Sequence, residues 1–174
     1  MRAVRRTGPG RALVPLPALA ALACAALTGC GSTASARDAP AGITVCAHAG
    51  DVDRLTLGRV DSLPRNHVYF SFPAHVAVTG AHRSQAVARA LCALPAMPAG
   101  TFSCPADWGI NYRLIFTAGD SKLAPVTIDA TGCQQVHGLG PVRWTVFSPG
   151  FWSVLATAAG IGPADQAAFS GTPP

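Results

Sequence analysis

Residues 104–133 read CPADWGINYRLIFTAGDSKLAPVTIDATGC. Apolar side chains alternate with polar ones on both sides of the turn-prone tetrapeptide Ala118-Gly119-Asp120-Ser121. Alternation with a period of two is typical of strands that bury one face, and a short Gly/Asp/Ser segment between two such runs is typical of a hairpin loop. The stretch therefore predicts a β-hairpin. The residues expected on its buried face are Tyr112, Leu114, Phe116, Val126, Ile128 and Ala130.

Cys104 and Cys133 flank the two predicted strands, so pairing of the strands brings the two thiols together. A disulfide there closes a loop of about 30 residues and stabilises the fold by ~3–4 kcal/mol. Four cysteines follow residue 30 and allow three pairings. We favour Cys104–Cys133 together with Cys46–Cys92; the alternative is Cys92–Cys104 together with Cys46–Cys133.

Two helices are predicted on either side of the hairpin. The first opens at Thr79-Gly80, buries residues at helical spacing between 87 and 94, and stops at Pro95. The second has Ser148 as N-cap and Pro149 in its first turn, and it stops at Gly160.

Further short strands are predicted by alternation at residues 43–46, 54–60 and 68–78, the last interrupted by Pro73. Together these elements predict an α+β fold: a small antiparallel sheet with two α-helices, stapled by two disulfides. We expect this globular domain to cover residues 43–161 and residues 162–174 to form a disordered tail.

The N-terminal part of the chain has a different composition. Residues 1–11 hold four arginines and no acidic residue, and residues 12–26 are apolar but contain Pro15 and Pro17. An apolar run of this length is too short to span a bilayer, which needs about 20 residues, but it suits the central region of a signal peptide.

The tetrapeptide Leu27-Thr28-Gly29-Cys30 at the end of that run resembles the lipobox of bacterial lipoproteins. The resemblance implies a signal peptide over residues 1–29, cleavage before Cys30, and acylation of that cysteine with a diacylglycerol and fatty acids such as palmitate. The polar segment 30–42 would then tether the domain to the extracytoplasmic face of the cell membrane. The alternative is cleavage after Ala34-Ser35-Ala36, which would give a secreted protein.

The net charge of the chain also depends on this boundary. Four of the 13 basic residues precede Cys30 whereas all 8 acidic residues follow it, so the part after residue 29 carries nine basic and eight acidic residues. The basic excess belongs to the export segment, and we expect no nucleic-acid partner.

No pattern of catalytic residues emerges from the sequence. The chain contains no Glu, no G-x-S-x-G motif and no closely spaced pair of histidines or C-x-x-C. A hydrolase built on Asp and His residues, for example His75 or His82 with Asp51 or Asp53, stays an alternative. We expect no enzyme, metal or cofactor.

The segment Pro105-Ala106-Asp107-Trp108 is the best candidate for a binding loop in this sequence. Its other interpretation is a turn at the start of a strand, with the Asp side chain bonded to the backbone and Gly109 at positive φ. Trp108, Tyr112, Trp144 and Trp152 could line a groove, although aromatic residues at such spacings usually form the core.

Two further resemblances rest on this region. The Leu-Pro, Cys-Pro-Ala-Asp-x-Gly, Tyr-Arg-Leu-x-Phe and Gly-Cys pattern between Leu91 and Cys133 is similar to exported proteins of high-GC Gram-positive bacteria, which implies no activity. More loosely, Cys104-Pro105 followed by a hairpin and Cys133 resembles the bacterial subtilisin-inhibitor family. That resemblance implies a protease-binding loop at Cys104–Asp107 with Ala106 as the specificity residue.

The sequence thus predicts an exported, lipid-anchored cell-surface protein with a binding or structural role. Its partners would be the membrane, through the anchor, and an extracellular protein or small ligand. Protease inhibition and surface hydrolysis are the alternative functions.

Overall fold

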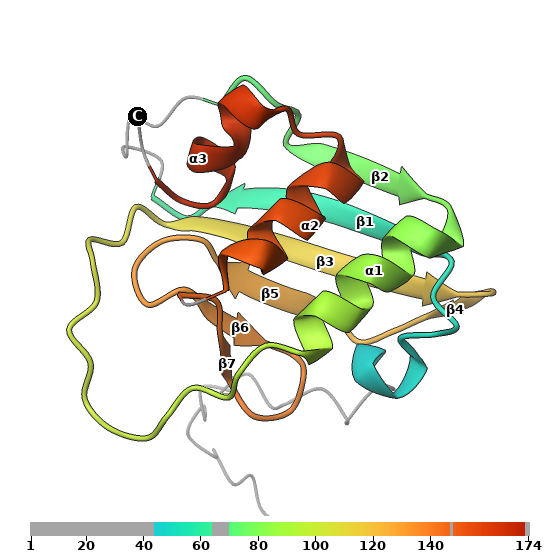
Figure 1. Cartoon of the computed structure of the whole chain (residues 1–174), viewed down its shortest axis with the longest axis horizontal. Coiled ribbons are helices and arrows are strands. Elements are labelled where there is room, and N and C mark those ends of the chain that lie inside the picture. The colour runs from blue at the N-terminus through green and yellow to red at the C-terminus, as the bar shows by residue number, and fades with distance from the viewer. Residues whose placement is uncertain (1–43, 64–69, 147, 173–174) are drawn as a thin grey trace, which may run out of the picture. The chain divides into compact units, whose positions relative to one another are not determined.

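A single antiparallel sheet organises the part of the chain that the computed structural model describes, residues 44–63, 70–146 and 148–172 (Figure 1). Its strands follow the order β2-β1-β3-β5-β6-β7, and the short β4 pairs with β3. The strands are β1 (Arg54–Asp61), β2 (His75–Thr79), β3 (Ile110–Ala118), β4 (Ser121–Lys122), β5 (Val126–Asp129), β6 (Gln135–His137) and β7 (Arg143–Trp144).

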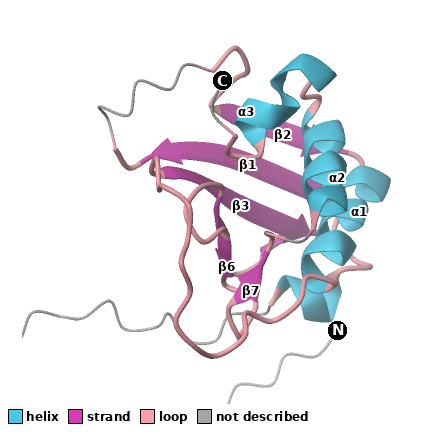
Figure 2. Cartoon of the chain, turned by 60° about the vertical axis from the view of Figure 1, so that its left-hand side comes forward, coloured by secondary structure: helices cyan, strands magenta, loops and turns pink. Residues whose placement is uncertain are grey.

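The helices in the described ranges cover only one face of this sheet, as Figure 2 shows. The 3₁₀ turn η1 (Val45–His48) lies against α1 (Ala81–Cys92), which packs beside α2 (Pro149–Ala159). The chain then continues through η2 (Pro163–Asp165) into the short α3 (Gln166–Phe169).

The predicted hairpin is confirmed and forms the centre of the sheet. In β3 and β5, Tyr112 pairs with Ile128 and Leu114 pairs with Val126. The residues expected on the buried face are all at most 1% exposed: Tyr112, Leu114, Phe116, Val126, Ile128 and Ala130. Because β3 also pairs with β1 along its whole length, it receives hydrogen bonds on both sides.

Both predicted helices are confirmed. Gly80 precedes α1, and Val87 and Leu91 are fully buried on its inner face. Pro149 opens α2, and Gly160 ends it with φ 72°, a left-handed conformation that suits glycine. The carbonyl of Ser148 accepts a hydrogen bond from the N–H of Phe151 at 2.9 Å, whereas its hydroxyl makes no capping bond.

The favoured disulfides are also confirmed. Cys46 is bonded to Cys92 with a Cα–Cα distance of 5.6 Å, and Cys104 is bonded to Cys133 with a Cα–Cα distance of 5.0 Å. The fold is therefore the predicted α+β sheet with helices and two disulfides, and the alternative pairing is not formed.

The strand predicted at 54–60 is confirmed as β1, the one at 43–46 is wrong, and the one at 68–78 forms only after Pro73, as β2. Val45–His48 forms a 3₁₀ turn, in which the N–H of Ala47 donates to the carbonyl of Thr44 at 3.2 Å. The turn lets Val45 enter the core while Cys46 reaches α1, a demand that four alternating residues do not reveal. Phe70 and Phe72 also lie outside any strand, since they pack edge-to-face on each other and hold the Arg59 guanidinium 3.8 Å from the Phe70 ring centre.

The expected disordered tail is a further correction, because residues 162–172 are folded. Phe169 is fully buried, with its ring centre 4.8 Å from that of Tyr112 and 5.5 Å from that of Phe72. One apolar side chain therefore anchors the two helical turns to the core, a role that the flanking Gly, Pro and Ala residues conceal in the sequence.

The predicted signal peptide, the lipobox cysteine Cys30 and the tether 30–42 lie outside the described residues, as does Ile43. Within the described ranges, no helix has both the length and the apolarity needed to cross a membrane.

Candidate functional site

The candidate site lies on the long connection between α1 and β3, residues 93–109. Most of this connection is exposed, and near its start Ala96 forms an isolated antiparallel bridge with Arg143 of β7. Further along, the Cys104–Cys133 disulfide attaches it to the segment that follows β5. The connection is thus held at both ends, and Pro105, Ala106, Asp107 and Trp108 remain exposed between Cys104 and β3.

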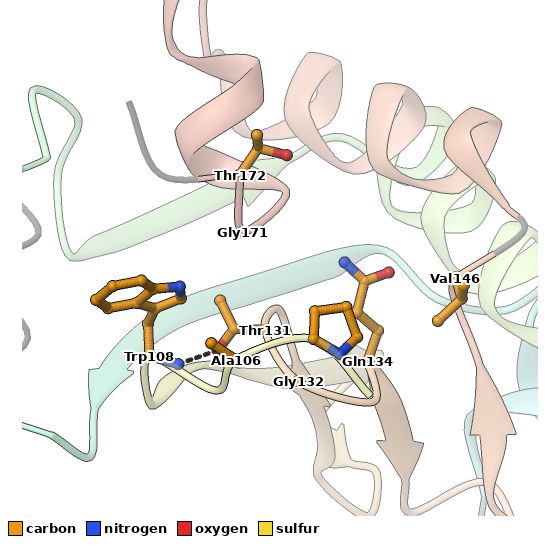
Figure 3. A pocket seen from close by; sticks show the side chains of 9 residues that line it. Ala106, Trp108, Thr131, Gly132, Gln134, Val146, Gly171 and Thr172 are labelled. Atoms are coloured by element: carbon orange, nitrogen blue, oxygen red, sulfur yellow. Dashed lines mark hydrogen bonds between the residues drawn. The ribbon is translucent and has the colours of Figure 1, made fainter. Parts of the chain in front are cut away.

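Asp107 organises this exposed segment from within. Its Oδ1 accepts hydrogen bonds from the backbone N–H of Gly109 at 2.8 Å and from the Thr131 hydroxyl at 2.6 Å. The same Thr131 oxygen accepts the N–H of Trp108 at 3.1 Å (Figure 3). The side chain therefore forms the predicted turn at the start of the strand and also links the loop to the far end of the hairpin.

Gly109 completes the turn and brings a second apolar residue close to Trp108. Its φ of 69° lies in the left-handed region, and a Cβ added there would lie 2.7 Å from Cγ of Leu63. Only glycine fits this position. The Gly109 carbonyl accepts both the N–H and the hydroxyl of Ser62, at 2.8 and 2.9 Å, so the end of β1 is held against the loop.

A hollow of about 350 Å³ opens between this loop, the β5–β6 connection and the C-terminal segment. Figure 3 shows Trp108 at one end of it, Gln134 farther along, and Thr172 on the opposite wall. The lining residues are Pro105, Ala106, Trp108, Thr131, Gly132, Gln134, Val146, Gly171 and Thr172.

Gln134 holds the walls of the hollow together. It is the only non-glycine residue with positive φ, 50°, among the described residues. Its side-chain nitrogen donates to the carbonyls of Ala130 at 3.0 Å and Ser170 at 3.3 Å. The strained backbone is thus offset by bonds that join the β5–β6 connection to the C-terminal segment.

The hollow offers a neutral, largely apolar surface to a partner. No lining side chain is charged, and the polar groups of Thr131 and Gln134 are already bonded within the protein. Among the large apolar side chains exposed in the described ranges, Trp108 is 37% and Val146 38% exposed beside the hollow. Leu63 is 48% exposed on the Gly109 side of the loop.

The other aromatic residues considered as groove residues have different positions. Tyr112 is 1% and Trp152 7% exposed in the core, and burial raises the pKa of the Tyr112 hydroxyl above its ordinary value. Trp144 is half-buried against Phe102, with ring centres 5.3 Å apart. Only Trp108 of the four lines the hollow.

The titratable side chains within the described ranges do not gather in one cleft. His48 lies 3.3 Å from Asp51 on the surface, and His137 lies 3.9 Å from Asp129 at the other side of the sheet. Burial raises the pKa of Asp129; the neighbouring His137 lowers it and Asp107 raises it further. In the described part of the chain, no group of three His, Cys, Asp or Glu residues is placed to hold a metal ion.

The sequence predicts the loop, but only three of the nine residues that line the hollow. Pro105, Ala106 and Trp108 were expected at a binding loop, whereas Gln134, Gly171 and Thr172 were not. Gly171 has φ 82°, and a Cβ there would overlap the carbonyl of Ala130, so its backbone lies directly against the hairpin. The signal available in the sequence was the glycine itself, placed two residues after an isolated phenylalanine.

No family model, curated protein or solved structure matches the chain.

Proposed function

We propose that this chain is an exported, lipid-anchored, non-enzymatic protein that binds a partner protein at the cell surface through the loop 104–108 and the adjoining hollow. The observation that carries the proposal is the exposed Trp108 on a loop that is braced by a disulfide and by the Asp107 side chain. Rigid, exposed aromatic residues at the edge of a pocket are typical of the few residues that dominate protein–protein affinity.

The character of the surface favours a protein over a polar small ligand. Pro105, Ala106, Trp108 and Val146 supply apolar area, and the nearby polar side chains are engaged internally. A sugar or a charged metabolite would find few free hydrogen-bond partners there, whereas an apolar side chain of a partner gains by leaving water.

A photo-crosslinking amino acid at position 106 of the full chain, expressed in the producing cell, tests this function. We expect a discrete adduct with one protein, which disappears when Trp108 is replaced by Ala. The matched control places the same group at Ala77, an exposed position of β2 on the sheet face away from the helices. Absence of a protein adduct, or the same adduct from both positions, would contradict the proposal.

Protease inhibition is a second candidate on the same loop. The exposed Pro105 and Ala106 directly follow a disulfide-bonded cysteine, and Asp107 braces the backbone beyond them. A loop held rigid on both sides of one peptide bond binds a protease without paying a large ordering cost. Titration of subtilisin-like proteases should then give stoichiometric inhibition, and simple cleavage after Ala106 would exclude it.

The anchor is tested separately, by the mass of the mature N-terminus. Acylated Cys30 as the first residue supports the lipid-anchored location. An unmodified chain that starts at Arg37 would instead support a secreted protein, and the binding loop would be unaffected by that result.

A further inference from the structure

The sheet face opposite the helices carries an excess of positive charge. Leu55, Leu57 and the buried residues of β3 point toward the helices. Alternate residues of the same strands therefore point to the other side, which none of the described helices covers (Figure 2). Six of the chain's 13 basic residues and one of its 8 acidic residues lie outside the described ranges. The described part therefore contains seven basic and seven acidic residues. Arg54, Arg113 and Lys122 are on the open face, against Asp129 alone.

One arginine and two histidines lie in one row that runs across five strands. The register aligns His75 with Gly58, Gly58 with Arg113, Arg113 with Thr127, and Thr127 with His137. Adjacent strands lie about 4.8 Å apart, so His75, Arg113 and His137 are spaced at intervals of roughly 10 Å. All three side chains are exposed.

Gly58 shapes this row. A Cβ at position 58 would lie 3.2 Å from Nδ1 of His75, so the imidazole lies over the glycine, between its own strand and that of Arg113. The absence of a side chain at position 58 therefore leaves room for the His75 ring over β1.

A second, shorter row lies nearer the other end of the strands. Arg54 aligns with Thr117, and Thr117 aligns with Lys122. Arg54 is partly engaged, because it donates to the carbonyl of Gly119 at 2.8 Å and lies 3.5 Å from Asp53. His137 of the first row has an acidic neighbour outside that row, because Asp129 lies 3.9 Å from it. Arg113 and Lys122 make no ion pair within 4.0 Å among the described residues.

We propose that this open face, defined by His75, Arg113, His137, Arg54 and Lys122, binds a linear polyanion whose chain runs across the strands. Evenly spaced donors along straight rows match repeated anionic groups, and guanidinium and ammonium groups are the side chains that bind such groups most strongly. Thr56 and Ala77 are also exposed on this face, and the apolar Val60 and Ile115 lie on the same side of the sheet.

Binding of the full chain to long-chain inorganic polyphosphate, measured at several salt concentrations, tests the proposal. The double variant Arg113→Gln/Lys122→Gln should lower affinity about tenfold and reduce the slope of log K against log salt by about 1.4, since each contact to a single-stranded polyanion contributes about 0.7. The matched control is the double variant Arg83→Gln/Arg89→Gln on α1, whose side chains are exposed on the helix side. It should bind as the unmodified protein does.

Several results would overturn this assignment. The first is that the full chain does not bind polyphosphate, and the second is that the α1 control loses as much affinity. The third is that the full chain binds phosphatidylglycerol vesicles or duplex DNA as strongly as polyphosphate. Replacing Trp108 by Ala should leave polyphosphate binding unchanged, and a loss there would place the polyanion at the loop instead.

Discussion

The helix-covered side of the sheet and the loop end of the molecule are ordered by different physical means. Under the helices, Tyr112, Phe169 and Leu155 are at most 1% exposed and order comes from apolar burial. At the loop end, Pro105, Ala106 and Trp108 are exposed, and order comes from one disulfide and the hydrogen bonds of Asp107. A surface that must remain available to a partner cannot be fixed by burial, so cross-links and polar bonds replace it.

Among the variants that test this difference, Phe169→Ala should lower the free energy of unfolding most. The ring lies among Phe72, Tyr112 and Trp152, so its removal leaves a cavity and should lower the free energy of unfolding by ~3–5 kcal/mol. Urea denaturation measures the change. Val60→Ala, at a position that is 50% exposed, is the control and should change stability by less than ~0.5 kcal/mol. Similar losses in both variants would show that the C-terminal segment is not part of the core.

Next in size is the double replacement Cys104→Ser/Cys133→Ser. The bridge spans 29 residues, and its removal should lower the free energy of unfolding by ~3–4 kcal/mol. The Trp108 loop should also become less ordered, which proteolysis and Trp fluorescence can measure. Cys46→Ser/Cys92→Ser, across 46 residues, should cost a similar amount but leave cleavage near Ala106 unchanged. Equal protection of the loop in both variants would contradict the role of the Cys104 bridge.

A smaller loss is expected from Asp107→Ala. The change removes the acceptor of the Gly109 N–H and of the Thr131 hydroxyl, and should cost ~1–3 kcal/mol. Hydrogen exchange should increase at Trp108 and Gly109 and stay unchanged in the helices. Asp120→Ala, at the exposed hairpin turn, provides the control and should be close to neutral. Faster exchange across the whole sheet would mean that Asp107 has no local role.

The smallest expected effect is the contribution of Asp129 to the pH dependence of stability. Its pKa is raised in the folded state, mainly by burial, so the folded protein binds that proton more tightly than the unfolded chain. This contribution to stability is fully present below the unfolded pKa, about 3.9, and is lost as pH rises through the folded pKa.

The variant Asp129→Asn removes that contribution. Relative to the variant, the unmodified protein should therefore gain stability as the pH is lowered from 7 toward 3, as urea denaturation at each pH can show. The opposite trend would mean that the ion pair with His137 outweighs burial.

Strong periodic patterns explain how much of the fold was predictable. The alternation around Tyr112 and the helical spacing near Leu91 each extend over several turns or pairs, and both were confirmed with the two disulfides. Val45 and Phe169 were misassigned because each fills the core alone, and a single apolar side chain has no periodicity. Phe70 was misassigned because it alternates with Phe72 as in a strand, although the two rings pack on each other outside the sheet. Their roles depend on where distant segments meet.

The candidate site divides in the same way. Pro105, Ala106, Asp107 and Trp108 are adjacent in the sequence and carry turn chemistry, so the loop was visible. Gln134 and Thr172 join it only through tertiary packing, and the open face exists only because the register aligns His75, Arg113 and His137 from three separate strands.

The most direct test of the central claim is the crosslinking of position 106 in the producing cell, with and without Trp108. Our account predicts a single protein adduct from position 106 that is lost in the Trp108→Ala variant, in a protein whose urea unfolding is little changed. A persisting adduct in that variant, or no protein adduct at all, would contradict the assignment of the loop as the binding surface.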